Sequence, residues 1–202
     1  MTKYVIYILL VVTTFSCSKK IEIDENKVFK LNRYDNISSL DPINARTQAN
    51  NWACNLIYNS LVKIDQQLEI QPDIAKSWVI SSNGKTYSFT LKNDVYFHKH
   101  EAFGKDSTRI VTASDFVFSF DRLKDPKAGG SGGWIMNNID SYQAKNDSVF
   151  EIKLKEAYPA FLGLISMKYA SVVPKELFKN GNADFLEHPI GTGPFQFKIW
   201  ED

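Results

Sequence analysis

The amino-acid sequence predicts a mixed α and β fold, and three observations support this fold class. Apolar residues recur at helical spacing over residues 48–61. Segments of alternating apolar and polar residues flank the Asn-Gly pair at 83–84 and the Asn-Asp pair at 146–147, which is typical of β-hairpins. Helical and extended patterns are mixed without the regular strand–helix–strand order of a parallel sheet.

The first third of the chain contains four short predicted elements. Residues 28–34 alternate apolar and polar side chains and predict a strand. Residues 48–61 place Trp52, Leu56, Ile57 and Leu61 on one helical face, and Thr47 is suited to cap that helix. We expect a short strand over residues 62–65 and one helical turn over 72–76.

The first hairpin is predicted around Asn83-Gly84, the strongest short-range hairpin signal in the chain. Residues 77–80 and 86–91 form its two extended arms, and residues 95–97 predict a further strand. A helix then begins at Thr112, where Asp115 three positions later gives a near capping box. Asp125-Pro126 ends that helix.

The remaining predicted elements are shorter. The glycine-rich segment 129–133 indicates a flexible loop that ends at Trp134. A second hairpin is expected from two alternating arms at residues 139–145 and 149–154. Four further segments follow: a helix over 159–167, a strand over 171–173, a helical turn over 174–179 and a strand over 195–200.

Composition is that of an ordinary globular protein. The chain has 202 residues, 44% of them hydrophobic, with 24 basic and 23 acidic side chains. These values exclude wholesale disorder, and two cysteines exclude a disulfide scaffold. A net charge of +1 gives no general basic field, so we expect no nucleic-acid partner.

The N-terminus has the pattern of an export signal. Lys3 precedes an apolar run over residues 4–12, which is shorter than the roughly 20 residues of a membrane-spanning helix. Cys17 follows at the position of the cysteine that bacterial lipoproteins acylate. We expect a signal peptide over residues 1–16, lipidation of Cys17 and a polar tether over 17–27. The alternative is a plain signal peptide with an incidental cysteine.

Few residues indicate chemistry. Cys54 lies among apolar residues and predicts a buried small side chain. Gly191-Thr192-Gly193 precedes an extended segment, so it indicates a tight turn more than a phosphate site. His98 and His100 face the same side of an extended segment and could bind one metal ion, but no nearby residue supplies further ligands. A secreted metal-dependent hydrolase is therefore the alternative function, and a solvated strand end is the simpler reading of these histidines.

Two polar or aromatic segments could face a ligand. Trp134 follows the glycine-rich loop, and the residue alone is equally compatible with a core position and with a ligand contact. Arg46, Thr47 and Gln48 lie between a Pro-containing turn and a helix, where a helix N-terminus explains them without a ligand.

A chain of motifs resembles one family. Residues 74–127 contain A-x-S-W, N-G-x-x-Y-x-F-x-L, V-x-F-H and T-A-x-D-F-x-F-S-F-x-R-L in order. The flanking motifs are Ser39-Leu40-Asp41-Pro42, Val173-Pro174-Lys175 and the P-I-G-T-G-P-F run at 189–195. Together they resemble the extracellular solute-binding proteins of oligopeptide, dipeptide and nickel ABC importers. Asn83 replaces the usual Asp, and Lys99-His100 replaces the usual Asp-Gly; both changes fall on turns.

The resemblance implies a periplasmic-binding-protein-like fold of class II, in which two lobes close over a ligand. It implies that residues 28–58 and 170–202 belong to the core of the first lobe, with residues 59–169 as an inserted subdomain. The second lobe would lie beyond residue 202, so we expect an N-terminal fragment. Arg46, Thr47, Gln48 and Trp134 are the implied ligand contacts.

The implied function is capture of peptides, with nickel or haem less favoured, and delivery to the permease of an ABC importer. No catalysis and no cofactor are expected. The resemblance and the signal together predict an exported, periplasmic monomer that is lipid-anchored to a bacterial membrane.

Overall fold

The computed structural model describes residues 27–32, 34–128, 130–178, 185 and 188–200. Contacts divide the chain into two units, Met1–Asn32 and Arg33–Asp202. Residues 28–32 of the first unit contain no strand, so the strand predicted over 28–34 is not found there. Every element discussed below belongs to the second unit. No helix of the described residues has the length and apolar character needed to cross a membrane.

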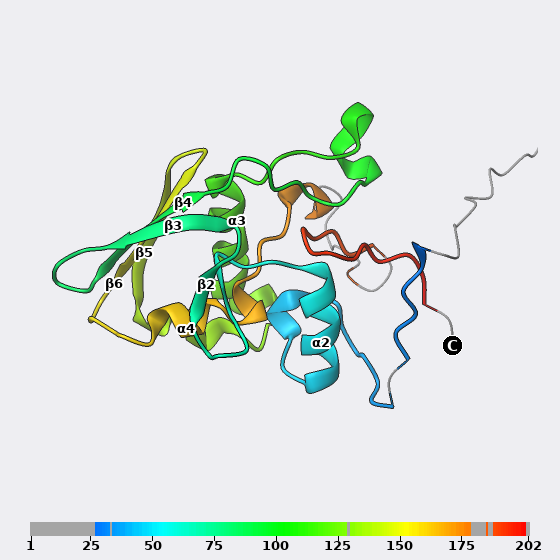
Figure 1. Ribbon diagram of the computed structural model, residues 1–202, viewed down its shortest axis with the longest axis horizontal. Helices are drawn as coiled ribbons and strands as arrows, with labels where there is room; N and C mark the ends of the chain where they lie inside the picture. Colours follow the sequence, from blue (N-terminus) through cyan, green and yellow to red (C-terminus); the bar gives the residue numbers. More distant parts are fainter. Residues whose placement is uncertain (1–26, 33, 129, 179–184, 186–187, 201–202) are drawn as a thin grey trace, which may run out of the picture. The chain divides into compact units, whose positions relative to one another are not determined.

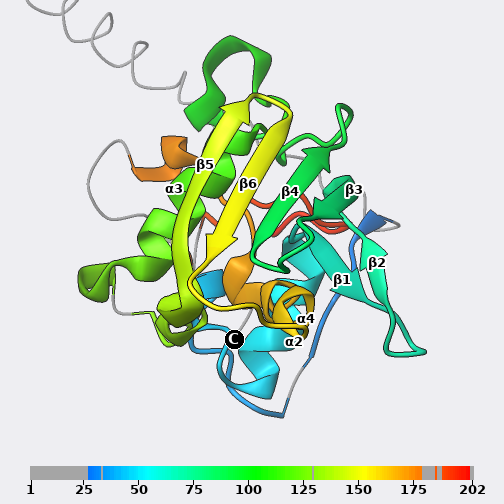
Figure 2. The same ribbon diagram turned by 90° about the vertical axis from the view of Figure 1, so that its left-hand side faces the viewer.

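A four-stranded antiparallel sheet with strand order β3-β4-β6-β5 is the largest element of the second unit (Figure 1). The strands are β3 (Ala75–Ile80), β4 (Thr86–Leu91), β5 (Ile139–Asn146) and β6 (Val149–Leu154). Figure 2 shows them side by side in that order. β3 pairs with β4 and β5 with β6, so both predicted hairpins are confirmed.

The turn of the first hairpin explains why its sequence was informative. Gly84 has a φ of 68°, in the left-handed region where glycine is favoured. The Asn83 side chain accepts a hydrogen bond from the Lys85 amide at 3.1 Å, and the Ser81 amide donates to the Thr86 carbonyl at 2.9 Å. These local contacts set the strand register without help from distant residues.

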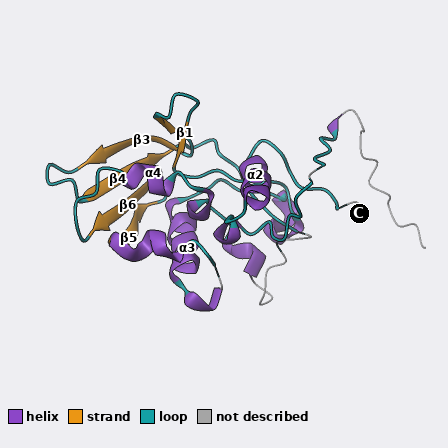
Figure 3. Ribbon diagram, turned by 90° about the horizontal axis from the view of Figure 1, so that it is seen from below, coloured by secondary structure: helices purple, strands orange, loops and turns teal. Residues whose placement is uncertain are grey.

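One face of the sheet forms most of the core. Alternate residues of β4 and β6 are buried there: Tyr87, Phe89, Leu91, Phe150, Ile152 and Leu154. Helix α3 (Ala113–Lys124) packs on the β5 and β6 side of this core, as Figure 3 shows from below. Phe116 and Phe120 place their ring centroids 5.6 and 5.3 Å from that of Phe150. The predicted capping box of Thr112 and Asp115 is present.

A second apolar cluster surrounds α2 (Gln48–Ile57). Thr47 caps this helix as predicted, because its side chain accepts from the Asn50 amide. The helix ends at Ile57, four positions before the predicted end at 61, and Tyr58 is already extended. Cys54 is fully buried in this cluster, which confirms its prediction as a small core residue.

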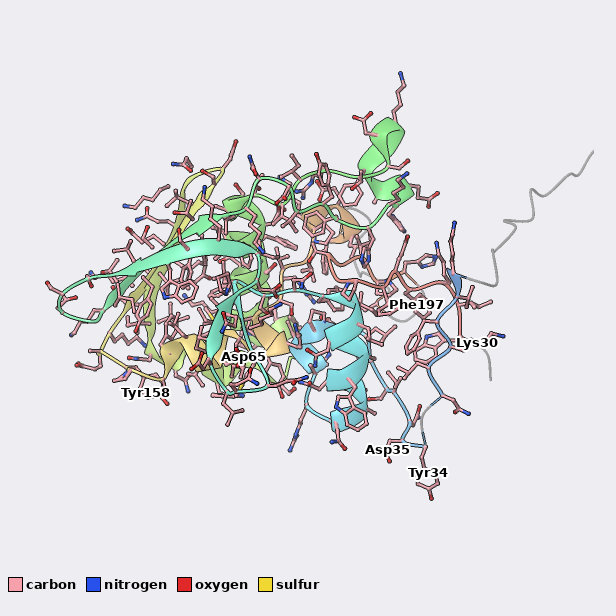
Figure 4. The ribbon with its side chains drawn as sticks, in the orientation of Figure 1. Lys30, Tyr34, Asp35, Asp65, Tyr158 and Phe197 are labelled. Atoms are coloured by element: carbon pink, nitrogen blue, oxygen red, sulfur yellow. The ribbon has the colours of Figure 1, made fainter. Side chains whose placement is uncertain are left out.

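A small two-stranded sheet follows α2. It consists of β1 (Val62–Ile64) and β2 (Ile70–Pro72), which pair in antiparallel register. Asp65, labelled in Figure 4, closes the connection by accepting the amides of Gln67 and Glu69, both at 2.9 Å. The hydrogen bond from Glu69 is the main cause of the lowered pKa of the Asp65 carboxyl. The helical turn predicted over 72–76 is wrong, since Pro72 ends β2 and Ala75 begins β3.

The predicted strands over 95–97, 171–173 and 195–200 are also absent from the described residues. These segments make isolated hydrogen bonds in place of a ladder. Tyr96 forms a single bridge with Ile110, and the Phe195 amide donates to the Leu56 carbonyl. Alternation marks such segments as extended, but a strand also needs a continuous partner.

The shorter helical predictions correspond to short helices. The segment predicted over 159–167 contains α4 (Phe161–Ile165). The turn over 174–179 contains a 3-10 helix, Lys175–Phe178. The glycine-rich loop leads into another 3-10 helix, Gly133–Asn138, which carries Trp134.

Candidate functional site

A shallow hollow of about 360 Å³ lies beside the N-terminus of α2. Its lining consists of hydrogen-bonding side chains from two separate segments: Ser38, Ser39, Asn44, Arg46, Thr47, Asn50 and Ser131. Arg46 is the only charged residue among them, so the hollow contains one cationic group and no carboxylate. Two of the sequence-predicted ligand residues, Arg46 and Thr47, therefore line one hollow, whereas Gln48 and Trp134 do not.

Asn50 holds together the part of this hollow that residues 38–50 form. It is only 3% exposed, and its Oδ1 accepts from the Ser38 amide at 3.0 Å. Its Nδ2 donates to the Ser38 hydroxyl and to the Asn44 carbonyl, both at 3.2 Å. Sequence analysis missed this residue. The available signal was a polar side chain in the first turn of an amphipathic helix, next to buried Ala49.

The glycine-rich loop reaches the hollow through close backbone packing. The amides of Ser131 and Gly132 donate to the Ile43 carbonyl at 3.0 and 3.3 Å. A Cβ atom on Gly132 would lie 2.5 Å from the Tyr169 ring, and one on Gly130 would lie 2.9 Å from Ile43 Cβ. Glycine at these two positions thus permits the approach that brings Ser131 beside Asn44 and Thr47.

Trp134 is 47% exposed, which excludes the fully buried core position left open by the sequence. It extends from the 3-10 helix that follows the loop and is separated from Ser131 by two glycines. Whether it contacts a ligand remains a prediction, as it does for Arg46, Thr47 and Gln48.

The histidines proposed for a hydrolase have other partners. A carbonyl oxygen can only accept, so His98 Nε2 donates its proton to the Gly193 carbonyl at 2.8 Å. His100 Nδ1 accepts from the Ala102 amide at 3.0 Å, which leaves the proton of the neutral ring on Nε2. Within the described part of the chain, no group of at least three His, Cys, Asp or Glu side chains could hold a metal ion. The geometry gives the hydrolase alternative no support.

The remaining candidate residues are the two cysteines. Burial, with a smaller effect of Asp41, raises the pKa of the Cys54 thiol to about 12, so this thiol is not activated as a nucleophile. Cys17, the predicted signal peptide and most of the tether lie outside the described residues.

Known proteins resemble this chain in sequence. The profile of the bacterial extracellular solute-binding proteins, family 5 Middle, matches residues 69–202. The chain is 33% identical over 162 residues to the dipeptide-binding protein of Escherichia coli strain K12, covering 72% of this chain and 30% of that protein. It is 31% identical over 164 residues to heme-binding protein A of Haemophilus influenzae, covering 73% of this chain and 30% of the relative.

Solved structures show the same relationship. The periplasmic binding protein DppA from Helicobacter pylori, in complex with the peptide STSA, superposes with a TM-score of 0.71 and 29% identity. That alignment covers 81% of this chain and 35% of the other chain. NikZ from Campylobacter jejuni, in complex with Ni(L-His), gives a TM-score of 0.70 and 31% identity, with 83% and 32% covered.

These alignments confirm the predicted fold class, mixed α/β of the periplasmic-binding-protein type. The chain spans about a third of the length of the relatives and structures that it matches. The matched region 69–202 contains the motif chain of residues 74–127 and the motifs at 173–175 and 189–195, whereas Ser39-Leu40-Asp41-Pro42 precedes it. The chain belongs to the bacterial extracellular solute-binding proteins of family 5.

Proposed function

We propose that this chain supplies part of the ligand-binding surface of a peptide receptor for an ABC importer. The supporting observation is the hollow in which Arg46 and Thr47 meet Ser131, a residue distant in sequence. Relatives named for dipeptide and di/tripeptide binding favour peptides. The relatives named for heme and Ni(L-His) make those ligands the less favoured alternatives.

The lining chemistry suits a peptide backbone. Hydroxyl and amide side chains both donate and accept hydrogen bonds, as the N–H and C=O groups of an extended peptide require. Backbone recognition of this kind tolerates varied side chains. Because a second lobe would supply the remaining contacts, we propose that residues 21–202 alone bind peptides more weakly than micromolar.

The same proposal covers export and partners. It holds that Cys17 anchors a monomeric, periplasmic receptor to a bacterial membrane through lipid, and that a permease accepts the ligand. It assigns no catalytic step to the chain. The matched relatives described above are named as binding proteins, which favours this view.

The test is a titration of the chain with defined di- and tripeptides, followed by backbone amide NMR. The expected result is weak, saturable shifts at the lining residues Thr47, Asn50 and Ser131. Arg46→Gln and Ser131→Ala should weaken binding several-fold. Ser82→Ala is the matched control, because Ser82 lies at an exposed turn away from the hollow.

Two results would count against the proposal. The first is the absence of amide shifts with every peptide, nickel and haem tested. The second is elemental analysis showing about one tightly bound transition metal per chain, which would favour the hydrolase alternative.

A further inference from the structure

A second hollow, of about 250 Å³, lies where α2, β1 and the chain after α4 meet. Its lining comes from all three segments: Asn51, Asn55, Lys63, Ile64, Ser166, Met167 and Lys168. It shares no residue with the first hollow. Two lysines line it without any acidic side chain, which makes it a basic site.

Lys168 is the unusual member of this lining because it is only 8% exposed. Its Nζ donates to the Tyr58 carbonyl at 3.1 Å. An ammonium group has three N–H donors, and this is its one hydrogen bond to the residues that the structure describes. Burying a cation without an opposite charge is unfavourable, so the remaining donors favour an anion in the hollow.

The surrounding charges do not neutralise Lys168. Asp73 attracts it, but no ion pair joins the two, and the Asp73 carboxylate instead accepts from Asn59 Nδ2 at 2.9 Å and the Ser60 amide at 3.1 Å. Lys63, which lines the same hollow, repels it. Burial first, and this repulsion to a smaller extent, lower the pKa of Lys168.

Three neutral polar side chains also line the hollow: Asn51, Asn55 and Ser166. Asn51 Oδ1 accepts from Asn55 Nδ2 at 2.8 Å. This orientation leaves the Asn51 amide nitrogen available, since it has no hydrogen bond to another described side chain or carbonyl. The Ser166 hydroxyl donates to the Gly163 carbonyl at 2.8 Å, so its proton is already used and is not offered to a ligand in the hollow.

We propose that this basic hollow binds a small oxyanion of the phosphate or carboxylate class. Lys63 and Lys168 would supply the charge, and Asn51 would supply a directed N–H donor. The volume admits one such group together with a short organic substituent. The proposal does not depend on peptide binding, because all the lining residues belong to the described part of this chain and lie outside the first hollow.

The test compares inorganic phosphate and succinate with sodium chloride at equal ionic strength. Affinity is measured by thermal unfolding and by the 15Nζ resonance of Lys168. The expected result is a higher melting temperature with at least one oxyanion and an upward shift of the Lys168 pKa on binding. Lys63→Met and Lys168→Met should each weaken that binding at least fivefold.

Lys76→Met is the matched control, since Lys76 is an exposed strand lysine that lines neither hollow. Lys63 is likewise exposed on a strand, so its variant keeps the test decisive even if Lys168→Met fails to fold. The proposal is overturned if chloride gives the same stabilisation. It is also overturned if Lys63→Met and Lys76→Met bind both oxyanions as tightly as the unsubstituted chain.

Discussion

Asp41 and Arg122 lie 81 residues apart and form an ion pair with Oδ2 and Nη2 separated by 2.8 Å. Asp41 also caps a 3-10 helix (Pro42–Asn44) by accepting from the Ile43 amide. The guanidinium of Arg122 lies over the rings of Phe178 and Phe185, with Cζ 4.5 and 4.9 Å from their centroids. The motif Ser39-Leu40-Asp41-Pro42 and the Arg122-Leu123 pair that ends the motif begun at Thr112 therefore contact each other through Asp41 and Arg122.

Removing one partner of this pair should be strongly destabilising. Both side chains are mostly buried, with 12% and 11% exposed, so Asp41→Asn or Arg122→Met leaves an unpaired charge with little solvent. We expect each single variant to lower the free energy of unfolding by roughly 3–5 kcal/mol. Urea denaturation of both single variants and the double variant measures the coupling. Strictly additive losses would show that the two residues do not act as a pair.

The glycines of the Gly191-Thr192-Gly193 turn are expected to be intolerant of a side chain. A Cβ atom on Gly191 would lie 1.9 Å from the carbonyl oxygen of Ile57, the last residue of α2. Gly191→Ala should cost about 1–3 kcal/mol or more, because the turn must move away from the helix. Gly163→Ala is the control, since nothing lies within 4 Å of its Cβ position. Equal melting temperatures for the two variants would contradict this packing.

His98 should make stability depend on pH. Burial is the main cause of its lowered pKa, below the ordinary value of 6.5, and Nδ1 has no hydrogen-bond partner in the described structure. Below pH 6.5 the unfolded chain therefore binds a proton that the folded chain resists, and stability falls as pH decreases toward the folded pKa. Well above pH 6.5, His98 is neutral in both the folded and the unfolded chain, and its contribution to the free energy of unfolding is constant.

The measurement is the free energy of unfolding between pH 5 and 8, roughly the range in which histidine titrates. His98→Gln should reduce the slope by up to one proton while keeping a donor for Gly193. The pKa of His100 is also lowered, mainly by burial, so the slope should shrink without vanishing. The unsubstituted chain is the reference, because His188 lies beside His100 and contributes to its lowered pKa. An unchanged slope in His98→Gln would refute the assignment.

The elements predicted correctly from sequence are those set by local chemistry. The turn at Gly84 and the capping box of Thr112 and Asp115 are complete within a few residues, so their sequence is sufficient. The failed strands at 171–173 and 195–200 depend on partners elsewhere in the chain. The Val172 amide donates to Asn59, and Phe195 donates to Leu56, contacts that no local pattern indicates.

In the candidate site, too, local features were predictable from the sequence and contacts between distant segments were not. Thr47 was predictable as a helix cap, and the family resemblance pointed to Arg46. The approach of Ser131 depends on the absence of side chains at Gly130 and Gly132, opposite Ile43 and Tyr169. That complementarity exists only in three dimensions, so the sequence indicated a flexible loop and not one wall of a hollow.

Asn50 is expected to hold together the wall of the hollow that residues 38–50 form. Asn50→Ala removes two donated hydrogen bonds and one accepted bond, and it leaves the Asn44 carbonyl and the Ser38 amide without this partner. Ser38 is exposed and the Asn44 carbonyl still accepts from the Arg46 amide, so each lost hydrogen bond should cost about 0.5–1.5 kcal/mol. The higher helix propensity of alanine offsets part of that loss. The net effect should be a lower free energy of unfolding and faster hydrogen exchange at the Ser38 amide.

Asn55→Ala is the matched control for this prediction. Asn55 lies on the same helix and gains the same propensity, but it is exposed and its side chain bonds only to Asn51 among the described residues. Urea denaturation should therefore separate the two variants, with Asn50→Ala the less stable. If both variants unfold at the same urea concentration and exchange the Ser38 amide at the same rate, the segment containing Ser38 and Asn44 is held by other contacts. The hollow would then persist without Asn50, and the convergence of its two walls would depend on the glycine-rich loop.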